Sequence, residues 1–141
     1  MKKKLFYIAA NIFVLLLLCT CKKYDDGPSF SFSSAGMRLC KLWYIDKVYE
    51  NNIDNTANFK NLYYQYNINY LTNGKYFVKY LDKTNNIEYT SNGTWNFDDH
   101  KKYLVRIPDG SDSIKFKILK LKSDQLWLLY EKGNQEWHFS Y

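Results

Sequence analysis

Three cysteines and two histidines are the side chains of this sequence best suited to nucleophilic catalysis or to zinc binding. Cys19 and Cys21 form a Cys-x-Cys pair, but no histidine or further cysteine lies nearby in the sequence to complete a tetrahedral metal site. The sequence around His100 and His138 contains none of the motifs of serine hydrolases, nucleotide hydrolases or zinc proteases. We therefore expect a protein that is not an enzyme and that holds no metal ion or other cofactor.

Two acidic stretches carry oxygen ligands of the kind that Ca²⁺ prefers in proteins. They are Asp98-Asp99 and Asp109-Gly110-Ser111-Asp112. Aspartate is also favoured in turns, because its carboxylate accepts hydrogen bonds from the backbone amides that follow it. We interpret both stretches as turns rather than as calcium sites.

The apolar run before Cys19 and Cys21 suggests a different chemistry for these thiols. Residues 1–4 are a methionine and three lysines, and residues 5–18 are almost all apolar. A basic start followed by an apolar run shorter than the ~20 residues of a membrane-spanning helix is typical of an export signal. We therefore expect residues 1–20 to be a signal peptide.

Leu18-Cys19-Thr20-Cys21 resembles the short box that ends the signals of bacterial lipoproteins, in which the last cysteine receives the lipid. The resemblance implies that Cys21 is the lipid attachment site and that acyl chains hold the mature protein on a membrane that it does not span. An uncleaved or conventionally cleaved signal and a metal clip are the alternatives. Cys19 would leave with the signal, so Cys40 could form no intramolecular disulfide, and we expect it to be a small buried hydrophobic residue.

The segment after the lipid attachment site, residues 21–36, is rich in Ser, Gly and Asp and is expected to be a flexible tether. Its first residues, Cys-Lys-Lys-Tyr-Asp-Asp, resemble the charged segment after the lipidated cysteine of lipoproteins in the Bacteroidetes. That resemblance implies an outer-membrane location, with the protein facing the periplasm or the cell exterior. A tether that is merely solvated is the alternative.

Loss of the signal would also remove three lysines, Lys2, Lys3 and Lys4, and would lower the formal net charge from +6 to +3. A charge this small gives no electrostatic reason to expect a nucleic-acid partner. The membrane is therefore the one large partner that the sequence indicates.

From Trp43 onward the sequence predicts strands, because aromatic and β-branched residues occur in short runs separated by turn-forming clusters. A short helical turn over residues 37–42 is expected before them. A long polar connection over residues 50–61 follows the first strand. The eight expected strands are residues 43–49, 64–70, 75–81, 87–97, 103–107, 114–121, 125–130 and 136–141.

Eight antiparallel strands with short connections favour an all-β, up-and-down barrel over residues 37–141, in which the last strand pairs with the first. Closure removes the two sheet edges, which otherwise invite aggregation. A sandwich of two four-stranded sheets is the alternative. Gly93 inside a strand suggests a sharp bend or a bulge, and a change of apolar phase at Ile118-Leu119 predicts a β-bulge.

Five short motifs occur along the expected strands: Leu42-Trp43, Asn73-Gly74-Lys75-Tyr76, Gly93-Thr94-Trp95, Ile118-Leu119-Lys120-Leu121 and Asp124-Gln125-Leu126. With these motifs and the order of its parts, the chain resembles the lipocalin-like lipoproteins of the Bacteroidetes over essentially its whole length. That resemblance implies an eight-stranded lipocalin-like barrel, and it implies a fold more than a function.

The aromatic side chains carry the binding signal of the sequence, which contains 14 tyrosines, 9 phenylalanines and 4 tryptophans. Tyrosine hydroxyls on an apolar wall can orient a small ligand, and an eight-stranded barrel has room for one. We expect a small apolar ligand in the barrel or at its mouth. A ligand-free interaction or assembly module with a filled interior is the alternative, as is an aromatic surface for a glycan or protein partner. The expected ligand-binding residues are Tyr64, Tyr66, Tyr70, Tyr89 and Trp95.

Overall fold

The strands follow one another along the chain and are joined mostly by short turns. The computed structural model describes Tyr24 and residues 33–141, so the predicted signal peptide and Cys21 lie outside the described residues. Each of the eight predicted strands is present, with bounds within one residue of those expected. The elements are α2 (Ala35–Leu39), β1 (Leu42–Glu50), β2 (Ile53–Asp54), α3 (Thr56–Leu62), β3 (Tyr64–Tyr70), β4 (Lys75–Asp82), β5 (Ile87–Asp98), β6 (Tyr103–Pro108), β7 (Ile114–Leu121), β8 (Gln125–Tyr130), the 3-10 helix η1 (Glu131–Gly133) and β9 (Gln135–Ser140).

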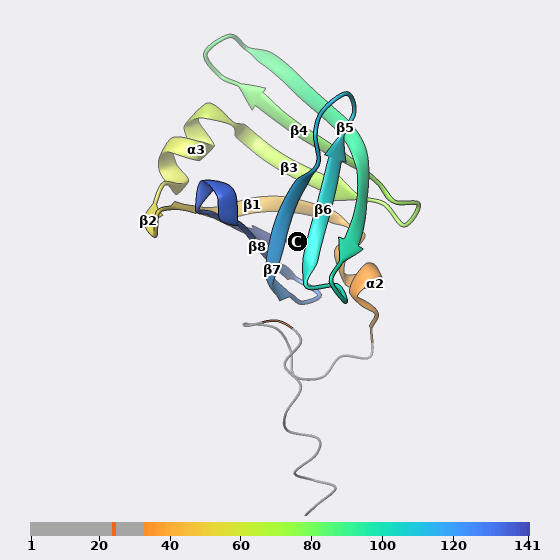
Figure 1. The fold of residues 1–141 in the computed structure, drawn as a ribbon. Helices are drawn as coiled ribbons and strands as arrows, with labels where there is room; N and C mark the ends of the chain where they lie inside the picture. The colour runs from red at the N-terminus through yellow and green to blue at the C-terminus, as the bar shows by residue number, and fades with distance from the viewer. Residues whose placement is uncertain (1–23, 25–32) are drawn as a thin grey trace, which may run out of the picture.

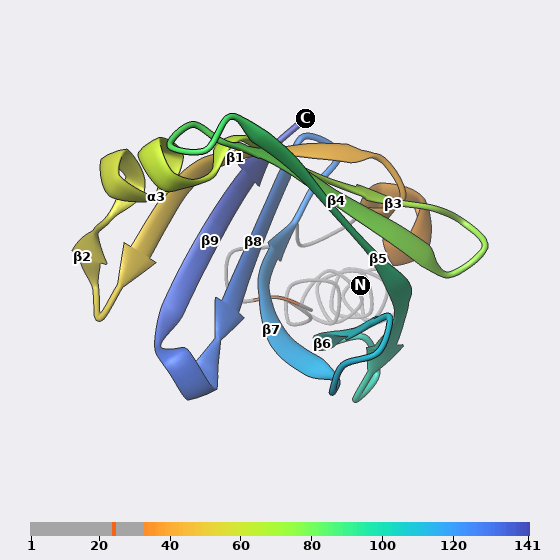
Figure 2. The ribbon, with the colours of Figure 1, turned by 90° about the horizontal axis from the view of Figure 1, so that it is seen from above.

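The sheet closes on itself, as predicted. From β3 to β9 every strand pairs antiparallel with the next, and β1 pairs with both β3 and β9. The β1–β9 contact runs from the Tyr44–Ser140 pair to the Glu50–Gln135 pair. The short β2 pairs only with the last two residues of β1, and the other eight strands form the barrel (Figures 1 and 2). The two-sheet sandwich is therefore excluded.

The sequence did not predict α3, which lies in the expected polar connection. Its first turn is fixed by Asp54, whose Oδ1 accepts a hydrogen bond from the Thr56 backbone N–H at 2.9 Å. None of its residues is buried, and Phe59 alone of them packs against the core as a partly buried hydrophobic side chain. A single inward side chain in a seven-residue helix produces no apolar period, so the pattern carried no signal.

At two positions, Ile118-Leu119 and Gly93, the sequence predicted an interruption of the regular strand. The register shifts between Ile118 and Lys120, which confirms the predicted bulge in β7. Of the sharp bend or bulge predicted at Gly93, the bulge is absent, because the pairing of β5 with both neighbours continues through this residue. Gly93 is required for a close approach instead, since a Cβ there would collide with the Ile107 carbonyl oxygen and the Tyr76 ring.

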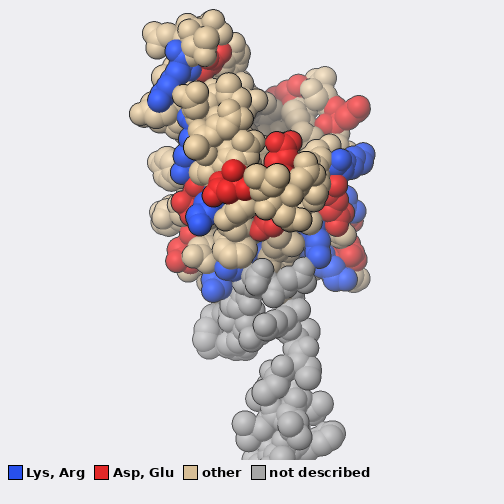
Figure 3. Space-filling model, turned by 90° about the vertical axis from the view of Figure 1, so that its left-hand side faces the viewer, with Lys and Arg blue, Asp and Glu red and all other residues tan. Residues whose placement is uncertain are grey.

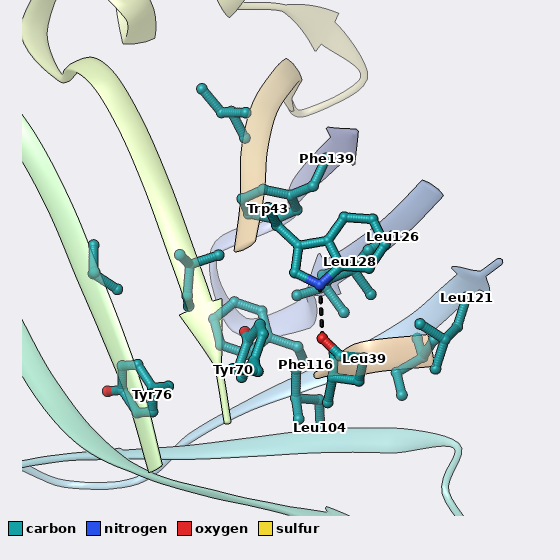
Figure 4. Packing of buried hydrophobic residues seen from close by; sticks show 14 of the residues in the cluster. Leu39, Trp43, Tyr70, Tyr76, Leu104, Phe116, Leu121, Leu126, Leu128 and Phe139 are labelled. Carbon is teal, nitrogen blue, oxygen red and sulfur yellow. Dashed lines mark hydrogen bonds between the residues drawn. The ribbon is translucent and has the colours of Figure 1, made fainter. Parts of the chain in front are cut away.

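One end of the barrel, beside α2, is filled by close-packed side chains (Figure 4). Trp43 is fully buried there, and its Nε1 donates a hydrogen bond to the Leu39 carbonyl oxygen at 2.8 Å. The helix itself begins at Ser34, whose Oγ accepts from the Met37 backbone N–H. The helix begins two residues before the predicted turn and packs against this end of the barrel. Other side chains packed in this core are Leu104, Phe116, Leu121, Leu126, Leu128 and Phe139.

Candidate functional site

The other end of the barrel lies beside α3 (Figure 1) and is built mainly from aromatic rings. Phe59 projects from α3 toward the barrel, with its ring centroid 5.4 Å from that of Tyr66 on β3 and 5.7 Å from that of Trp137 on β9. The helix is tied to β1, because the Thr56 Oγ1 accepts a hydrogen bond from the Val48 backbone N–H at 3.0 Å. Phe59 is thus held against two strands that are distant in the sequence but close in the barrel.

A cavity of about 440 Å³ opens between α3 and these strands. Its polar rim includes Glu50, whose carboxylate accepts hydrogen bonds from the side-chain amides of Asn55 at 3.3 Å and Gln135 at 3.4 Å. Figure 3 faces the side of the molecule that carries α3, and basic and acidic side chains are interspersed over it. The aromatic walls are Phe59, Tyr63, Tyr66, Tyr80 and Trp137, and the lining also includes Asn58 and Leu62.

Arg106 on β6 lies deeper in the barrel, behind two of the cavity walls. Its side chain is buried, and its Cζ lies 4.0 Å from the ring centroid of Phe116 and 5.5 Å from that of Trp137. Tyr66 also forms a side-chain hydrogen bond with this guanidinium. Tyr66 and Trp137 therefore contact both the cavity and the buried cation.

The guanidinium of Arg106 has no acidic partner among the described residues, since none of their ion pairs includes it. Burial lowers the pKa of Arg106, but the oxygens of Tyr70, Tyr66 and Tyr76 raise it, and the net pKa lies above its ordinary value. Burial also raises the pKa of Tyr66 and Tyr70, against the opposing charge of Arg106. At neutral pH the site therefore holds a charged guanidinium beside protonated hydroxyls.

Two buried nitrogen atoms in this region, the Arg106 Nε and the Trp137 Nε1, have no hydrogen-bond partner. Buried polar groups in proteins are nearly always satisfied, so each such atom calls for an explanation. Both are able to donate a hydrogen bond. The deep end of the site is thus rich in donors and in positive charge, while its rim carries the Glu50 carboxylate.

The structure brings together only some of the predicted ligand-binding residues. Tyr66 and Tyr70 point inward beside Arg106 and are 7% and 1% exposed. Trp95 is partly buried, and its Nε1 donates to the Leu71 carbonyl oxygen at 3.1 Å. Its ring lies edge-on to Tyr70, so Trp95 supports the inner wall rather than the cavity beside α3.

The expected inward placement of Tyr64 is wrong. The register of β3 shifts between Tyr64 and Asn67, with Gln65 in a left-handed conformation at φ 55°. This bulge moves Tyr64 to the opposite face from Tyr66, where it is 37% exposed and lies under the Lys83 ammonium group. The strict alternation of the sequence gave no sign of the extra residue.

Tyr89 is not enclosed either, being 42% exposed. It lies on the part of β5 that projects beyond the barrel with β4 (Figure 1), and its ring stacks on that of Tyr80 with centroids 5.2 Å apart. Tyr80 in turn stacks on Tyr66. Tyr89 is therefore joined to the cavity through Tyr80 but does not line it.

Sequence reasoning missed the three residues that matter most at this end: Arg106, Trp137 and Phe59. Alternation places Arg106 in phase with the buried Leu104, so an inward arginine could have been recognised from the strand pattern. Trp137 is likewise in phase with the buried Phe139. Phe59 had no such signal, because it belongs to the helix that the pattern did not reveal.

The remaining candidates for chemistry stay apart. Within residues 33–141 and Tyr24, no group of three or more His, Cys, Asp or Glu side chains is placed to hold a metal ion. Asp98 instead accepts hydrogen bonds from Lys115 and from the Asp99 backbone N–H, as in a turn. His138 stacks on Trp127 and contacts Glu136 on the outer face. Cys40 is half-buried rather than buried, and burial raises the pKa of its thiol.

The helices of the described part of the chain include none that is long and apolar enough to cross a lipid bilayer.

The comparisons with known proteins agree with this architecture. A family model described as a lipocalin-like domain matches residues 39–128. The fold is also similar to the crystal structure of a DUF4847 family protein from Bacteroides vulgatus ATCC 8482, with a TM-score of 0.51 and 11% sequence identity. That similarity covers 74% of this chain and 94% of the other. None of the curated proteins compared with the chain matches it.

Proposed function

We propose that this chain, which belongs to the lipocalin-like domain family, binds a small, largely apolar ligand in the cavity beside α3. The observation that carries the proposal is the cavity of about 440 Å³ walled by five aromatic side chains. Ligand sites are typically clefts of roughly 300–1,000 Å³ with apolar walls and a few polar groups that fix the orientation. This cavity has that size and that lining.

The two ends of the barrel differ in a way that favours this cavity over the interior as a whole. The α2 end is filled by buried side chains, as the ligand-free alternative requires. The α3 end keeps open space, and residues with polar side chains, such as Tyr63, Tyr66 and Gln135, are among those that line it. The proposed function is binding, and it includes no catalytic step.

The binding proposal can be tested with a neutral aromatic probe, 2-naphthalenemethanol. Its binding to the full chain in detergent is measured by isothermal titration, with protein-free micelles as the blank, and the purified chain is extracted for co-purified small molecules. We expect saturable binding that Phe59→Ala weakens at least tenfold and that Phe77→Ala leaves unchanged. Phe77 is a matched control because it lies on β4 outside the cavity lining and is 37% exposed.

An empty chain that does not bind the probe would contradict the proposal and would favour the interaction or assembly module. Equal effects of Phe59→Ala and Phe77→Ala would show that the probe binds elsewhere. The circular dichroism spectrum and the thermal midpoint of each variant confirm that the barrel is folded.

We also propose that the chain is a lipoprotein, anchored through Cys21 to the outer membrane and facing the periplasm or the cell exterior. The lipobox-like sequence supports this, and so does the position of Tyr24, three residues after Cys21. Tyr24 is buried in the core cluster, and the charge of Arg38 on α2 acts on its hydroxyl. Three residues span at most about 11 Å, so the α2 end would lie near the bilayer and the α3 cavity would face away from it.

Anchoring is tested by labelling cells with a radioactive fatty acid and separating the membranes. We expect the wild type and the Cys19→Ala variant to carry label in the membrane fraction, and the Cys21→Ala variant to carry none. Label that persists in Cys21→Ala would overturn the assignment of the acylated residue.

A further inference from the structure

We infer that the ligand of this cavity carries a carboxylate, which the buried guanidinium of Arg106 selects. The inference rests on the proposed binding function and names the chemical class of its ligand. Arg106 is 4% exposed, and none of the ion pairs of the described residues includes it. Burying an arginine without a counter-charge is strongly unfavourable, and proteins normally compensate it with an acid, a metal site or a bound anion.

The groups around Arg106 that belong to the described part of the chain do not provide that counter-charge. Phe116 and Trp137 present ring faces to the guanidinium, which gives a weaker attraction than a carboxylate does. Tyr66, Tyr70 and Tyr76 offer neutral hydroxyls. Asp109 acts on Tyr76 but forms no ion pair with Arg106.

The unpartnered atoms of the site also call for an acceptor. The Arg106 Nε and the Trp137 Nε1 are both buried without a hydrogen-bond partner, and each is able to donate. A carboxylate has two oxygens and about four acceptor positions, and arginine binds it in a planar, bidentate geometry. One small anionic group thus supplies both the charge and the hydrogen-bond acceptors that this region lacks.

Two side chains separate the cavity beside α3 from this cation. Tyr66 and Trp137 line the cavity, and both contact Arg106, so they are the side chains between the open space and the guanidinium. Along β1 and β9, the Glu50–Gln135 pair lies at the rim and the Val48–Trp137 pair lies two residues farther into the barrel. The charge therefore changes from negative at the rim to positive at depth.

This gradient sets the orientation of a carboxylate ligand. Glu50 disfavours a second negative charge at the mouth, and Arg106 favours one at the inner end. The apolar body of the ligand would then lie against Phe59 and Tyr80, which line the outer part of the cavity. The same gradient would hold a cationic head at the rim beside Glu50, and a neutral head has no preferred direction.

The inference is tested on the wild-type full chain with three probes of similar size: 2-naphthoate, 2-naphthalenemethanol and 2-naphthylmethylammonium. Titrations at pH 7, with protein-free micelles as the blank, are expected to give the affinity order carboxylate, alcohol, ammonium, with at least tenfold between the first two. This series requires no variant to fold. Equal affinities, or tighter binding of the ammonium probe, would overturn the inference while leaving the binding proposal intact. Failure of all three probes would overturn both.

Arg106→Met then identifies the residue responsible. It keeps a long unbranched side chain and removes the charge, so 2-naphthoate should lose its tenfold advantage while 2-naphthalenemethanol binds as before. Arg38→Met is the matched control, because Arg38 is also a buried arginine but lies on α2. A preference for 2-naphthoate that survives Arg106→Met, or that Arg38→Met abolishes equally, would contradict the assignment.

Discussion

The two ends of the barrel are built from the same eight strands but are filled in different ways. Around Trp43, at the α2 end, the buried side chains are mostly aliphatic and the indole N–H has a backbone acceptor. At the α3 end the side chains are mostly aromatic, several are only partly buried, and a cavity remains between them. Branched aliphatic side chains interdigitate closely, whereas large rigid rings around a mouth leave space between them.

The difference indicates a division of labour between stability and binding. The close-packed end buries apolar side chains, which stabilises the fold. The open end retains free volume beside the buried Arg106 and two unpartnered nitrogen atoms, all of which lower stability in the absence of a ligand. Arg38 at the α2 end is also buried with an unpartnered Nε, so the free volume is the feature that distinguishes the open end. Such features persist where they serve a function. Three substitutions can test this division.

Trp43→Ala should have the largest effect, because Trp43 is fully buried at the α2 end. Removing a large buried aromatic side chain typically lowers the free energy of unfolding by about 3–5 kcal/mol. Urea titration of the full chain, followed by circular dichroism, measures the loss. A decrease below about 1 kcal/mol would mean that the α2 end is not the stabilising half of the barrel.

Arg106→Met should change stability in the opposite direction. Replacing a buried charge by an apolar side chain of similar length is often stabilising, and here we expect the ligand-free chain to gain about 1–3 kcal/mol. The same urea titration measures the gain. Destabilisation would show that the contacts of Arg106 with Phe116 and Trp137 already compensate its burial, and it would remove one argument for a bound anion.

Phe59→Ala should separate stability from binding most clearly. Phe59 is only partly buried, so we expect a loss of about 1 kcal/mol, well below the 3–5 kcal/mol of a fully buried aromatic residue. The tenfold or larger loss of probe binding should exceed this loss in stability. If stability falls as far as in Trp43→Ala, α3 belongs to the structural core and the comparison between the ends fails.

The fold could be predicted largely from the sequence because local pattern and closure agree in this chain. Strand phase and turn residues are local signals, and eight short antiparallel strands have few ways to remove both sheet edges. The bulge at Ile118 shifts the apolar residues of β7 from one alternation phase to the other, so the sequence predicted it. The bulge at Gln65 causes no such change in the apolar pattern, so the sequence did not predict it. The sequence marked Gly93 as an unusual residue within a strand. A glycine is required there because a neighbouring backbone and a ring lie too close for a Cβ, and this tertiary contact cannot be read from the sequence.

The candidate site could be predicted only in part. The alternation of β3 predicted that Tyr66 and Tyr70 face the interior. Arg106 and Trp137 are also in phase with buried residues of their strands, but nothing in the pattern marked them as binding residues. The cavity itself depends on where α3 lies on the barrel, and Phe59 sets that position through contacts with β3 and β9. Contacts between segments so distant in sequence cannot be read from periodicity.

The smallest expected effect concerns two turn aspartates, one ending β4 and one ending β5. The hydrogen bond from Lys115 is the largest factor that lowers the pKa of Asp98, whereas the neutral amide of Asn85 plays this part for Asp82. A carboxyl whose pKa is lower in the folded state stabilises the fold above its unfolded pKa, near 3.8, and loses that contribution as the pH falls through the folded value. Both residues should therefore favour folding at neutral pH and less so below about pH 4.

Salt distinguishes the two aspartates, because it screens the attraction of an exposed ion pair more than a hydrogen bond from a neutral amide. Raising the salt concentration from 0.05 to about 0.5 M should move the pKa of Asp98 toward 3.8 and leave that of Asp82 nearly unchanged, as followed by NMR titration of the carboxyl carbons. Lys115→Met should reproduce the effect of salt on Asp98 alone. Equal salt dependence of the two residues would mean that the Lys115 contact is not a persistent ion pair, and that both turns are held by their own backbone hydrogen bonds.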